Sequence, residues 1–265
     1  MSEQIIGMRQ WFETPPGRYL LAWERAEFDR AVGDIFGFHA LQLGLPELDA
    51  LRANRMPHRW LALREAGPSD GNPVRPGMYC DFATLPFEEN SIDLVVLPHS
   101  LELNTDPHAT LREVERVLVP EGKVVICCLN PASLWGLRQR RAHLYRRLGF
   151  GGLYLPDAGD FIGYWRLRDW LRLLSFEVES GSFGCYRPAF KTDKWLQRSD
   201  WIDPVGERWW PIFGAVYFIV AVKRVRGMKL IGLPWKTSKK RAAAVAVANR
   251  EPAYQEYQEY QEEHS

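Results

Sequence analysis

The sequence predicts an α/β protein built on an open, doubly wound and mostly parallel sheet. Residues 92–97 and 123–129 are continuous apolar runs, the pattern of strands that are buried on both faces of a parallel sheet. Between them, residues 106–118 have the periodicity of an amphipathic helix, the kind of crossover that two parallel strands need. With 265 residues, 46% of them hydrophobic, the chain is long enough for one sizeable core.

The amino-terminal third is predicted to hold helices and the first strands. In order, we expect a helical preface over 1–38, a strand over 40–45, a short helix over 46–56, a strand over 60–64 and a loop over 68–76. Apolar side chains recur at near-helical spacing through the preface, and the break at Pro15-Pro16-Gly17 precedes its longer part. The glycines and prolines of 68–76 interrupt any regular element.

A carboxylate loop joins the next two strands. Residues 78–80 form a short apolar strand that brings Asp81 to a strand end, and a turn-rich connection leads to the strand 92–97. Ligands of open α/β sheets bind outside the carboxyl ends of the strands, so Asp81, His99, Ser100 and Glu102 are expected to converge on one rim. The alternative is that Asp81 only caps its own turn.

The carboxy-terminal half continues the pattern. Asp106 at the N-cap and Pro107 at the first helical position start the crossover helix. After the strand 123–129 we expect a cap segment over 131–165, a helix over 167–174, and strands over 176–179 and 216–225.

Eight ordered segments carry a family resemblance. They are Asp81-Phe82-Ala83-Thr84-Leu85-Pro86-Phe87, Asn90-Ser91-Ile92-Asp93-Leu94-Val95-Val96, His99-Ser100-Leu101-Glu102, Asp106-Pro107, Leu111-Arg112-Glu113-Val114, Arg116-Val117-Leu118, Pro120-Glu121-Gly122 and Asn130-Pro131. From about residue 78 to 131 the chain thereby resembles the central block of class I S-adenosylmethionine-dependent methyltransferases of the small-molecule (type 11) group. The resemblance implies a Rossmann-like sheet that ends in a C-terminal antiparallel hairpin, and S-adenosyl-L-methionine as the cofactor.

The resemblance also implies roles for five residues. Asp81 would accept the adenine amino group, Phe82 would offer a backbone N–H and a ring face, and the loop at Gly44 would approach the methionine part. Glu65, at the end of the second strand, is the candidate acid for the ribose hydroxyls; an ordinary solvated Glu is the alternative. His99 would orient the cofactor or take a proton from an acceptor hydroxyl, unless it is a structural histidine.

The chain departs from the family in the loop after the first strand. Gln42 stands where the family has a carboxylate, and Pro46 and Leu48 stand where it has glycines. Glycines allow φ > 0 and a close approach to a ligand, whereas proline fixes φ and has no N–H. These replacements predict that binding of S-adenosylmethionine is weak or lost.

The net charge excludes no class of partner, but the cysteines indicate a reducing compartment. The net charge is +1, and the four cysteines show no C-x-x-C spacing, so they are expected to be free thiols with no disulfide and no metal site. We expect no secretory signal, because residues 1–10 have no basic region that leads into an apolar stretch. The longest apolar run, 212–222, is about half of what a spanning helix needs. We therefore expect a cytoplasmic protein.

Two segments could contact partners. The cap carries five arginines, Arg138, Arg140, Arg141, Arg146 and Arg147. They are either the solvated face of an amphipathic helix or a surface for phosphate, carried by RNA or by an anionic membrane. The four tryptophans of 195–211 are expected to pack the edge of the core, with base stacking as the alternative.

The chain divides into a domain and a tail. Residues 39–226 are expected to form the methyltransferase-like domain, and residues 227–265 a basic, then low-complexity tail with a repeated Tyr-Gln-Glu motif. Such a repeat cannot bury enough apolar surface to fold, so the tail is expected to be disordered.

Two functions follow from these patterns. The first is methyl transfer from S-adenosylmethionine to a small or lipid-like acceptor beneath the cap. The second is a protein that kept the fold and lost the chemistry, and that binds RNA or an anionic membrane. The ordered block from Asp81 onward favours the enzyme, and Pro46 favours the binding protein. The enzyme is the preferred interpretation.

Overall fold

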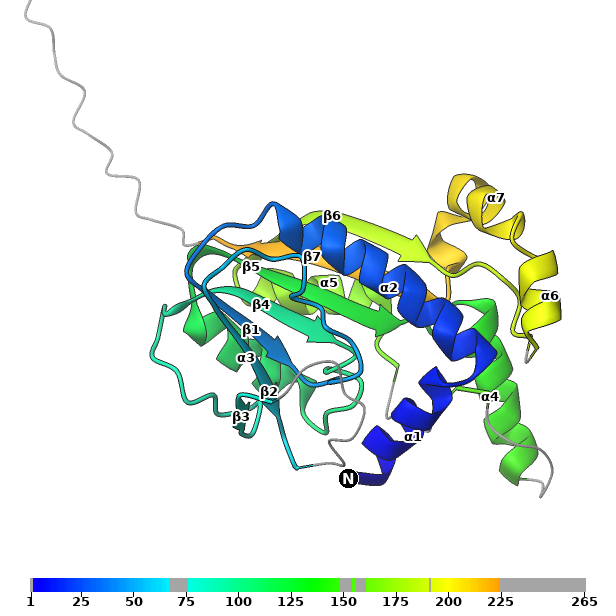
Figure 1. Cartoon of the computed structure of the whole chain (residues 1–265), viewed down its shortest axis with the longest axis horizontal. Helices are drawn as coiled ribbons and strands as arrows, with labels where there is room; N and C mark the ends of the chain where they lie inside the picture. Colours follow the sequence, from blue (N-terminus) through cyan, green and yellow to red (C-terminus); the bar gives the residue numbers. More distant parts are fainter. Residues whose placement is uncertain (1, 67–75, 148–153, 156–160, 191, 225–265) are drawn as a thin grey trace, which may run out of the picture. The chain divides into compact units, whose positions relative to one another are not determined.

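The computed structural model describes residues 2–66, 76–147, 154–155, 161–190 and 192–224. Its centre is a seven-stranded sheet of order β3-β2-β1-β4-β5-β7-β6 (Figure 1). The strands are β1 His39–Leu43, β2 His58–Leu63, β3 Met78–Tyr79, β4 Ile92–Pro98, β5 Leu118–Leu129, β6 Phe176–Gly184 and β7 Val216–Lys223. β1 to β5 are parallel, and β7 is antiparallel to both β5 and β6. The predicted mostly parallel sheet with its C-terminal hairpin is confirmed.

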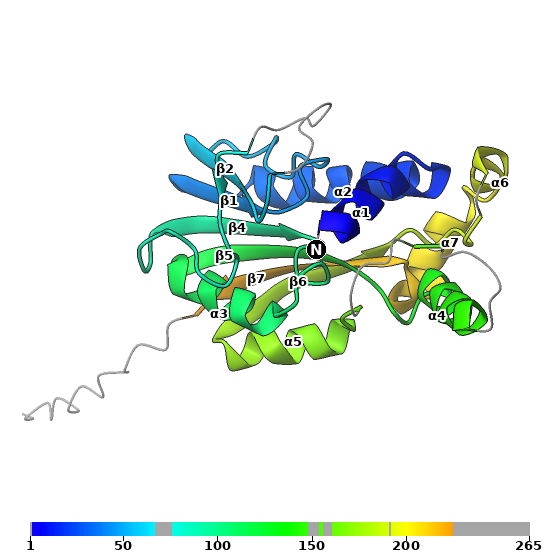
Figure 2. The same cartoon turned by 90° about the horizontal axis from the view of Figure 1, so that it is seen from below.

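Helices lie on both faces of the sheet and beyond one end of it. They are α1 Ser2–Phe12, α2 Pro15–Gly33, α3 Pro107–Val117, α4 Leu134–Arg147, α5 Tyr164–Leu173, α6 Asp193–Arg198, α7 Ile202–Trp209 and the short 3₁₀ turn η1 Pro211–Phe213. Figure 2 shows α1 and α2 on one side of the sheet and α3 and α5 on the other. A hydrophobic core lies on each face of the sheet, one beneath α1 and α2 and the other beneath α3 and α5. Along β4, Leu94 and Val96 belong to the former, and Val95 and Leu97 to the latter. This alternation explains the continuous apolar run in the sequence.

Local capping fixes where the principal helices begin. The Thr14 hydroxyl accepts a hydrogen bond from the Gly17 N–H at the start of α2. The Asp106 carboxylate accepts one of 2.9 Å from the Ala109 N–H at the start of α3, with Pro107 at the first position. The predicted helix start at Asp106 is therefore confirmed, and it satisfies one of the backbone donors that a helix leaves unpaired.

The short helix predicted over 46–56 is wrong, because this segment is a series of turns. The amide nitrogen of the buried Gln42 donates to the carbonyl oxygens of Gly44, Leu45 and Leu48 at 2.7–3.1 Å, and its oxygen accepts from the Ala50 N–H. A side chain that takes these backbone groups competes with the bonds of a helix. Gln42 thus holds the loop after β1 in a non-helical form.

The tryptophans between β6 and β7 were predicted to pack the core, and this is wrong. Trp195, Trp201, Trp209 and Trp210 are all more than half exposed. They belong to α6, α7 and the turns beside them, which extend beyond the sheet (Figure 1).

Residues 1–226 form one compact unit. The predicted tail lies outside the described residues, so its disorder stays a prediction. None of the helices in the described part of the chain is long and apolar enough to cross a membrane.

Candidate functional site

The carboxyl ends of four neighbouring parallel strands meet at one edge of the sheet, the rim. Gly44 follows β1, Glu65 lies just beyond β2, Asp81 follows β3, and His99 follows β4. The strand order therefore brings the backbones of these predicted residues to the same edge. Their side chains differ in what they contact.

Gly44 and Phe82 lie against each other at the end of β1. Gly44 has φ +76°, and a Cβ added there would lie 3.2 Å from the Ser100 hydroxyl and 3.7 Å from the Phe82 ring. Phe82 is buried, and Ser100 donates to the Leu43 carbonyl. A glycine is needed here both for its backbone conformation and for the close approach of these neighbours.

Asp81 caps its own turn and stays accessible. Its Oδ1 accepts from the Ala83 N–H at 3.2 Å and lies 3.4 Å from the Arg64 guanidinium, while about half of its side chain is exposed. Arg64 also donates to the Asn104 side chain at 2.6 Å. The cap and the binding role therefore do not exclude each other. Glu65, beside Arg64, is exposed.

Glu47 places an unpaired carboxylate oxygen in the loop after β1. Its Oε2 is buried and has no hydrogen-bond partner among the described residues. Burial raises the pKa of Glu47, and the charge of Arg9 offsets part of this effect. A buried carboxylate oxygen without a hydrogen bond is costly, so a cationic group that reached Oε2 would be stabilised.

His99 does not face the rim but lies between two carboxylates inside the protein. Its Nε2 is 2.6 Å from Glu24 Oε1, and its Nδ1 contacts Glu102 Oε1; all three side chains are fully buried. The other oxygen of Glu102 accepts from the Leu129 N–H at 2.9 Å. Burial alone would lower the pKa of His99, but Glu24 and Glu102 outweigh it and raise this pKa to about 10. At neutral pH the ring is therefore a buried cation.

Glu24 and His99 lie close to a third side chain that could ligate a metal ion, Cys127. Their ligand atoms lie within 4.8 Å of one another. Both ring nitrogens of His99 are bonded to carboxylates, however, and an imidazolium has no lone pair to give a metal ion. Burial raises the pKa of the Cys127 thiol well above its usual value, which keeps it neutral. The group is an ion-paired cluster.

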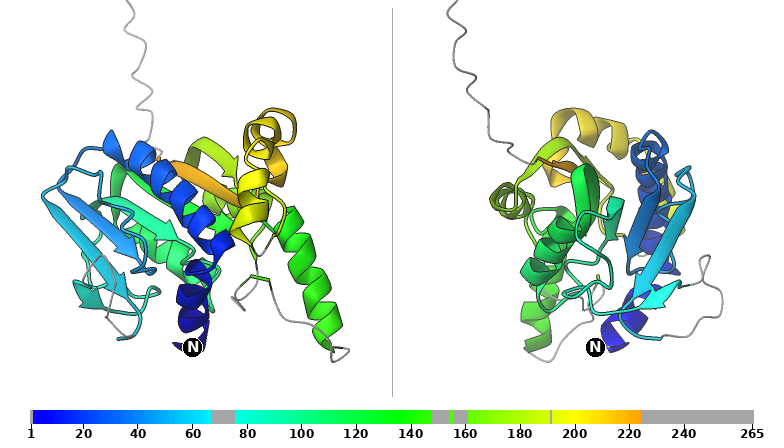
Figure 3. Two further views of the ribbon diagram at one scale, coloured as in Figure 1. Left: turned by 45° about the vertical axis from the view of Figure 1, so that its right-hand side comes forward. Right: turned by 90° about the vertical axis from the view of Figure 1, so that its left-hand side faces the viewer.

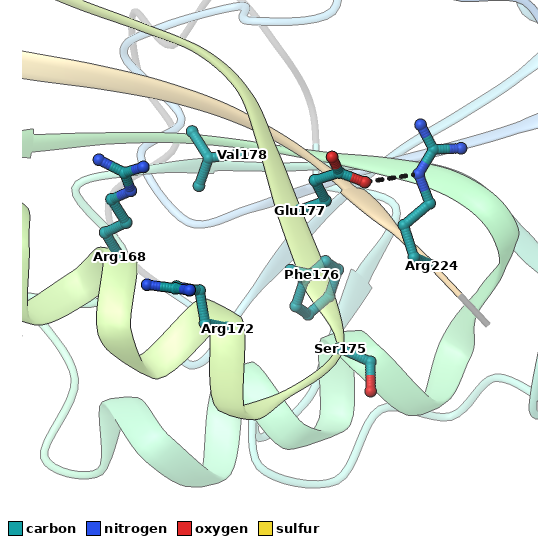
Figure 4. A pocket seen from close by; sticks show the side chains of 7 residues that line it. All are labelled: Arg168, Arg172, Ser175, Phe176, Glu177, Val178 and Arg224. Atoms are coloured by element: carbon teal, nitrogen blue, oxygen red, sulfur yellow. Dashed lines mark hydrogen bonds and ion pairs between the residues drawn. The ribbon is translucent and has the colours of Figure 1, made fainter. Parts of the chain in front are cut away.

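A separate groove of about 400 Å³ lies at the opposite end of the strands. Its lining includes Arg168 and Arg172 of α5 on one side of β6 and the Glu177–Arg224 ion pair on the other (Figure 4). Phe176, at the start of β6, pairs with Lys223 of β7, and the neighbouring Val222 pairs with Lys123 near the start of β5. The groove therefore lies at the edge where the parallel strands begin. None of the predicted site residues lines this groove.

Three contributors to the site were not singled out from the sequence. Arg64 and Glu47 gave no signal, because their roles depend on contacts between distant segments. Glu24 did give a signal in the sequence, because it stands four residues after Leu20 and four before Phe28, on the buried side of α2. A charged residue on the apolar face of a helix indicates a buried partner.

Comparisons with known proteins agree on one family. A family described as "Methyltransferase domain" matches residues 62–126. The chain is 32% identical over 178 residues to the uncharacterized protein YafS of Escherichia coli (strain K12), which covers 66% of this chain and 68% of that protein.

Two further matches extend this result. The ubiquinone/menaquinone biosynthesis C-methyltransferase UbiE of Cupriavidus pinatubonensis is 31% identical over 104 residues, which is 39% of this chain and 42% of that enzyme. The match thus spans less than half of the enzyme's length. The crystal structure of a SAM-dependent methyltransferase from Thermotoga maritima, a possible histamine N-methyltransferase, has the same fold, with a TM-score of 0.54 at 14% identity over 82% of this chain and 94% of that chain.

Proposed function

The chain belongs to the class I S-adenosylmethionine-dependent methyltransferases, and from this we propose that it transfers a methyl group to a lipid-like acceptor at the rim. The observation that carries the proposal is the constellation of Gly44, Phe82 and Asp81 at the ends of β1 and β3. When bound, S-adenosylmethionine supplies an activated methyl group, so the task left to the protein is alignment of the acceptor.

The rim residues fit this cofactor. S-adenosylmethionine is cationic at its sulfonium and amino groups, and the buried, unpaired oxygen of Glu47 is a complementary charge. The exposed half of Asp81 remains open to a hydrogen-bond donor such as the adenine amino group. We assign cofactor contacts to Gly44, Glu47, Glu65, Asp81 and Phe82 on this basis.

For His99 the geometry favours positioning over proton transfer. Its ring already carries a proton on each nitrogen, so it would have to give one to Glu24 or Glu102 before it could take one from an acceptor. Held as it is, His99 ties α2 to the connection after β4, and Glu102 extends the link to β5. We assign it the role of holding α1 and α2 against the rim.

Two observations support a lipid-like acceptor. The UbiE relative is named for ubiquinone and menaquinone biosynthesis, and menaquinone and ubiquinone are prenylated lipids. In this chain α4 exposes Leu134, Leu137 and Leu144 next to the segment that follows β5 at the rim. Apolar side chains beside the rim suit an acceptor with a long hydrocarbon chain.

The second candidate, binding without catalysis, rests on the loop after β1. The Gly44 N–H already donates to the Ala62 carbonyl, and Pro46 has no N–H to offer. The Leu48 N–H donates to the Leu45 carbonyl, and the Ala50 N–H donates to the side-chain oxygen of Gln42. A loop with so few open donors favours weak cofactor binding.

A methyl-transfer assay separates these candidates. Radiolabelled S-adenosylmethionine would be incubated with a prenylated quinol in detergent and, separately, with the same ring lacking the prenyl chain. We expect transfer to the prenylated compound only. Transfer only to the water-soluble ring would contradict the lipid-like acceptor, and no transfer to either, with cofactor binding intact, would favour the second candidate.

A further inference from the structure

Exposed apolar side chains are concentrated in two segments of the described molecule. Of the fourteen large apolar residues that are exposed in the described residues, nine lie in α4 or between residues 195 and 213. Trp201 is 66% exposed and Trp209 is 70% exposed. Burying such rings is favourable, so a group of them on the surface indicates a contact with something apolar.

The outer face of α4 combines leucine with arginine. Leu134, Leu137 and Leu144 are exposed, and so are Arg140 and Arg141 between them. α4 contains no acidic residue. No ion pair or hydrogen bond joins Arg140 or Arg141 to another residue of the described part of the chain.

The inner face of α4 already has its partners. Trp135 is buried and donates to the Arg187 carbonyl at 2.7 Å, and Gln139 accepts from the N–H groups of Tyr154 and Leu155. The helix therefore has a packed side and an open side. Its open leucines cannot be explained as part of the core.

The two segments lie at the same end of the molecule. Figure 1 and the left view of Figure 3 both show α4, α6 and α7 together beyond the end of β5. The second segment holds three acidic residues, Asp200, Asp203 and Glu207, of which the first two pair with Arg187, and two arginines of its own, Arg198 and Arg208. The acidic residue just before the segment, Asp193, pairs with Arg18. Arg140 and Arg141, which have no ion pair among the described residues, leave this end attractive to anions.

We propose that α4 and the 195–213 segment form a docking surface for an anionic phospholipid membrane. Tryptophan has an apolar ring and a polar N–H, which suits the boundary between headgroups and acyl chains. Arginine binds lipid phosphates, and helices that combine leucine with basic residues lie in that boundary. The docking surface would hold the rim close to acceptors dissolved in the bilayer.

The exposed aliphatic side chains distinguish a membrane from RNA. Arginine and tryptophan can also bind phosphates and stack on bases. Leu134, Leu137, Leu144 and Ile212 gain nothing from a polar, charged nucleic acid, but they lose water when they enter an acyl layer. The mixture on this surface therefore matches a lipid surface better.

Flotation of the full chain with vesicles tests the proposal. Vesicles of phosphatidylcholine alone would be compared with vesicles in which half of the lipid is phosphatidylglycerol, at low and high salt. The wild type should float with the anionic vesicles, and less so at high salt because ions screen the arginines. The experiment needs no cofactor, so its failure would leave the proposed methyl transfer untouched.

Matched variants locate the contact. Trp201→Ser with Trp209→Ser should lower vesicle affinity roughly tenfold or more, because both rings leave the lipid. Phe36→Ser with Phe38→Ser is the control, since these equally exposed rings lie before β1, at the other end of the strands. Arg140→Glu with Arg141→Glu should lower vesicle affinity by roughly fivefold or more per residue. The control is Arg166→Glu with Arg172→Glu on α5, which should change this affinity less.

Three results would overturn the proposal. Full vesicle binding by both test variants, each folded by circular dichroism, would place the contact elsewhere in the chain. Binding to single-stranded RNA without binding to vesicles would make the surface a nucleic-acid site. Loss of self-association in the tryptophan variants, with no vesicle binding by the wild type, would make it a contact between copies of this chain.

Discussion

The side chain of His99 lies between two carboxylates where water does not reach. Glu24 comes from α2 and Glu102 from the connection after β4, so one imidazolium joins two segments that are far apart in the sequence. Removing the proton would leave two buried carboxylates facing a neutral ring. The stability of the fold should therefore depend on the charge of this residue.

This dependence has a definite sign. The pKa of His99 is raised from 6.5 to about 10 in the folded protein. Between these two values His99 holds a proton in the folded state that it lacks in the unfolded state, so the stability that His99 contributes is complete below pH 6.5 and falls as the pH rises toward 10. The fall should approach about 1.4 kcal/mol per pH unit.

Urea denaturation at a series of pH values checks this prediction. His99→Gln should lose the decline between pH 6.5 and about 8, whereas His108→Gln, which changes an exposed histidine, should keep it. Above that range the buried thiol of Cys127, whose pKa is also raised, adds a decline that both variants share. If the His99 variant showed the same slope as the wild type, the buried cation would not be its source.

At the scale of elements, the loop after β1 is shaped by one side chain. Gln42 donates to three carbonyls and accepts from one N–H, and an acid at this position could not donate when ionised. Gln42→Glu should destabilise the protein by at least about 2 kcal/mol, because buried carbonyls would face a carboxylate.

The control for this substitution is Gln197→Glu on the exposed side of α6, which should change stability by less than about 0.5 kcal/mol. Chemical denaturation of both variants gives the comparison. Equal effects would mean that the Gln42 contacts contribute little.

Prediction from the sequence succeeds where the signal is local and fails where a segment is shaped by contacts with distant residues, as in this loop. The strands and α3 were predictable because their signals are local: apolar runs, an N-cap and a proline at Asp106-Pro107. The helix over 46–56 was not, since Gln42 acts through contacts that no periodicity reveals. The exposed tryptophans were misjudged for a related reason, because an aromatic residue gives the same local signal in a core and on a docking surface.

The candidate site was less predictable than the fold. The edge of the sheet at which Gly44, Asp81 and His99 meet follows from strand order, but the direction of each side chain does not. The His99 side chain points into the interior, where it contacts Glu24, a residue of α2 that lies 75 positions earlier in the chain. Its assigned role, like those of Glu65 and Phe82, stays a proposal.

At the scale of the whole molecule, residues 1–226 form the compact unit and should fold without the rest. The repeated Tyr-Gln-Glu motif has no apolar periodicity that could build a core. A chain that ends at Arg226 should keep the thermal midpoint of the full chain to within about 2 °C. A larger drop in differential scanning calorimetry would show that apolar residues such as Leu230 and Trp235 support the body.

Calorimetric titration with S-adenosylhomocysteine tests the central claim most directly. We expect saturable but weak binding, because Pro46 and Leu48 replace the glycines of the cofactor loop. Asp81→Ala should weaken it by about 1.5–3 kcal/mol, the value of a hydrogen bond to a charged group. Glu88→Ala, an exposed acid in the connection before β4, should not. Absence of any heat at millimolar ligand, or equal affinities for wild type and Asp81→Ala, would contradict a cofactor site at this rim.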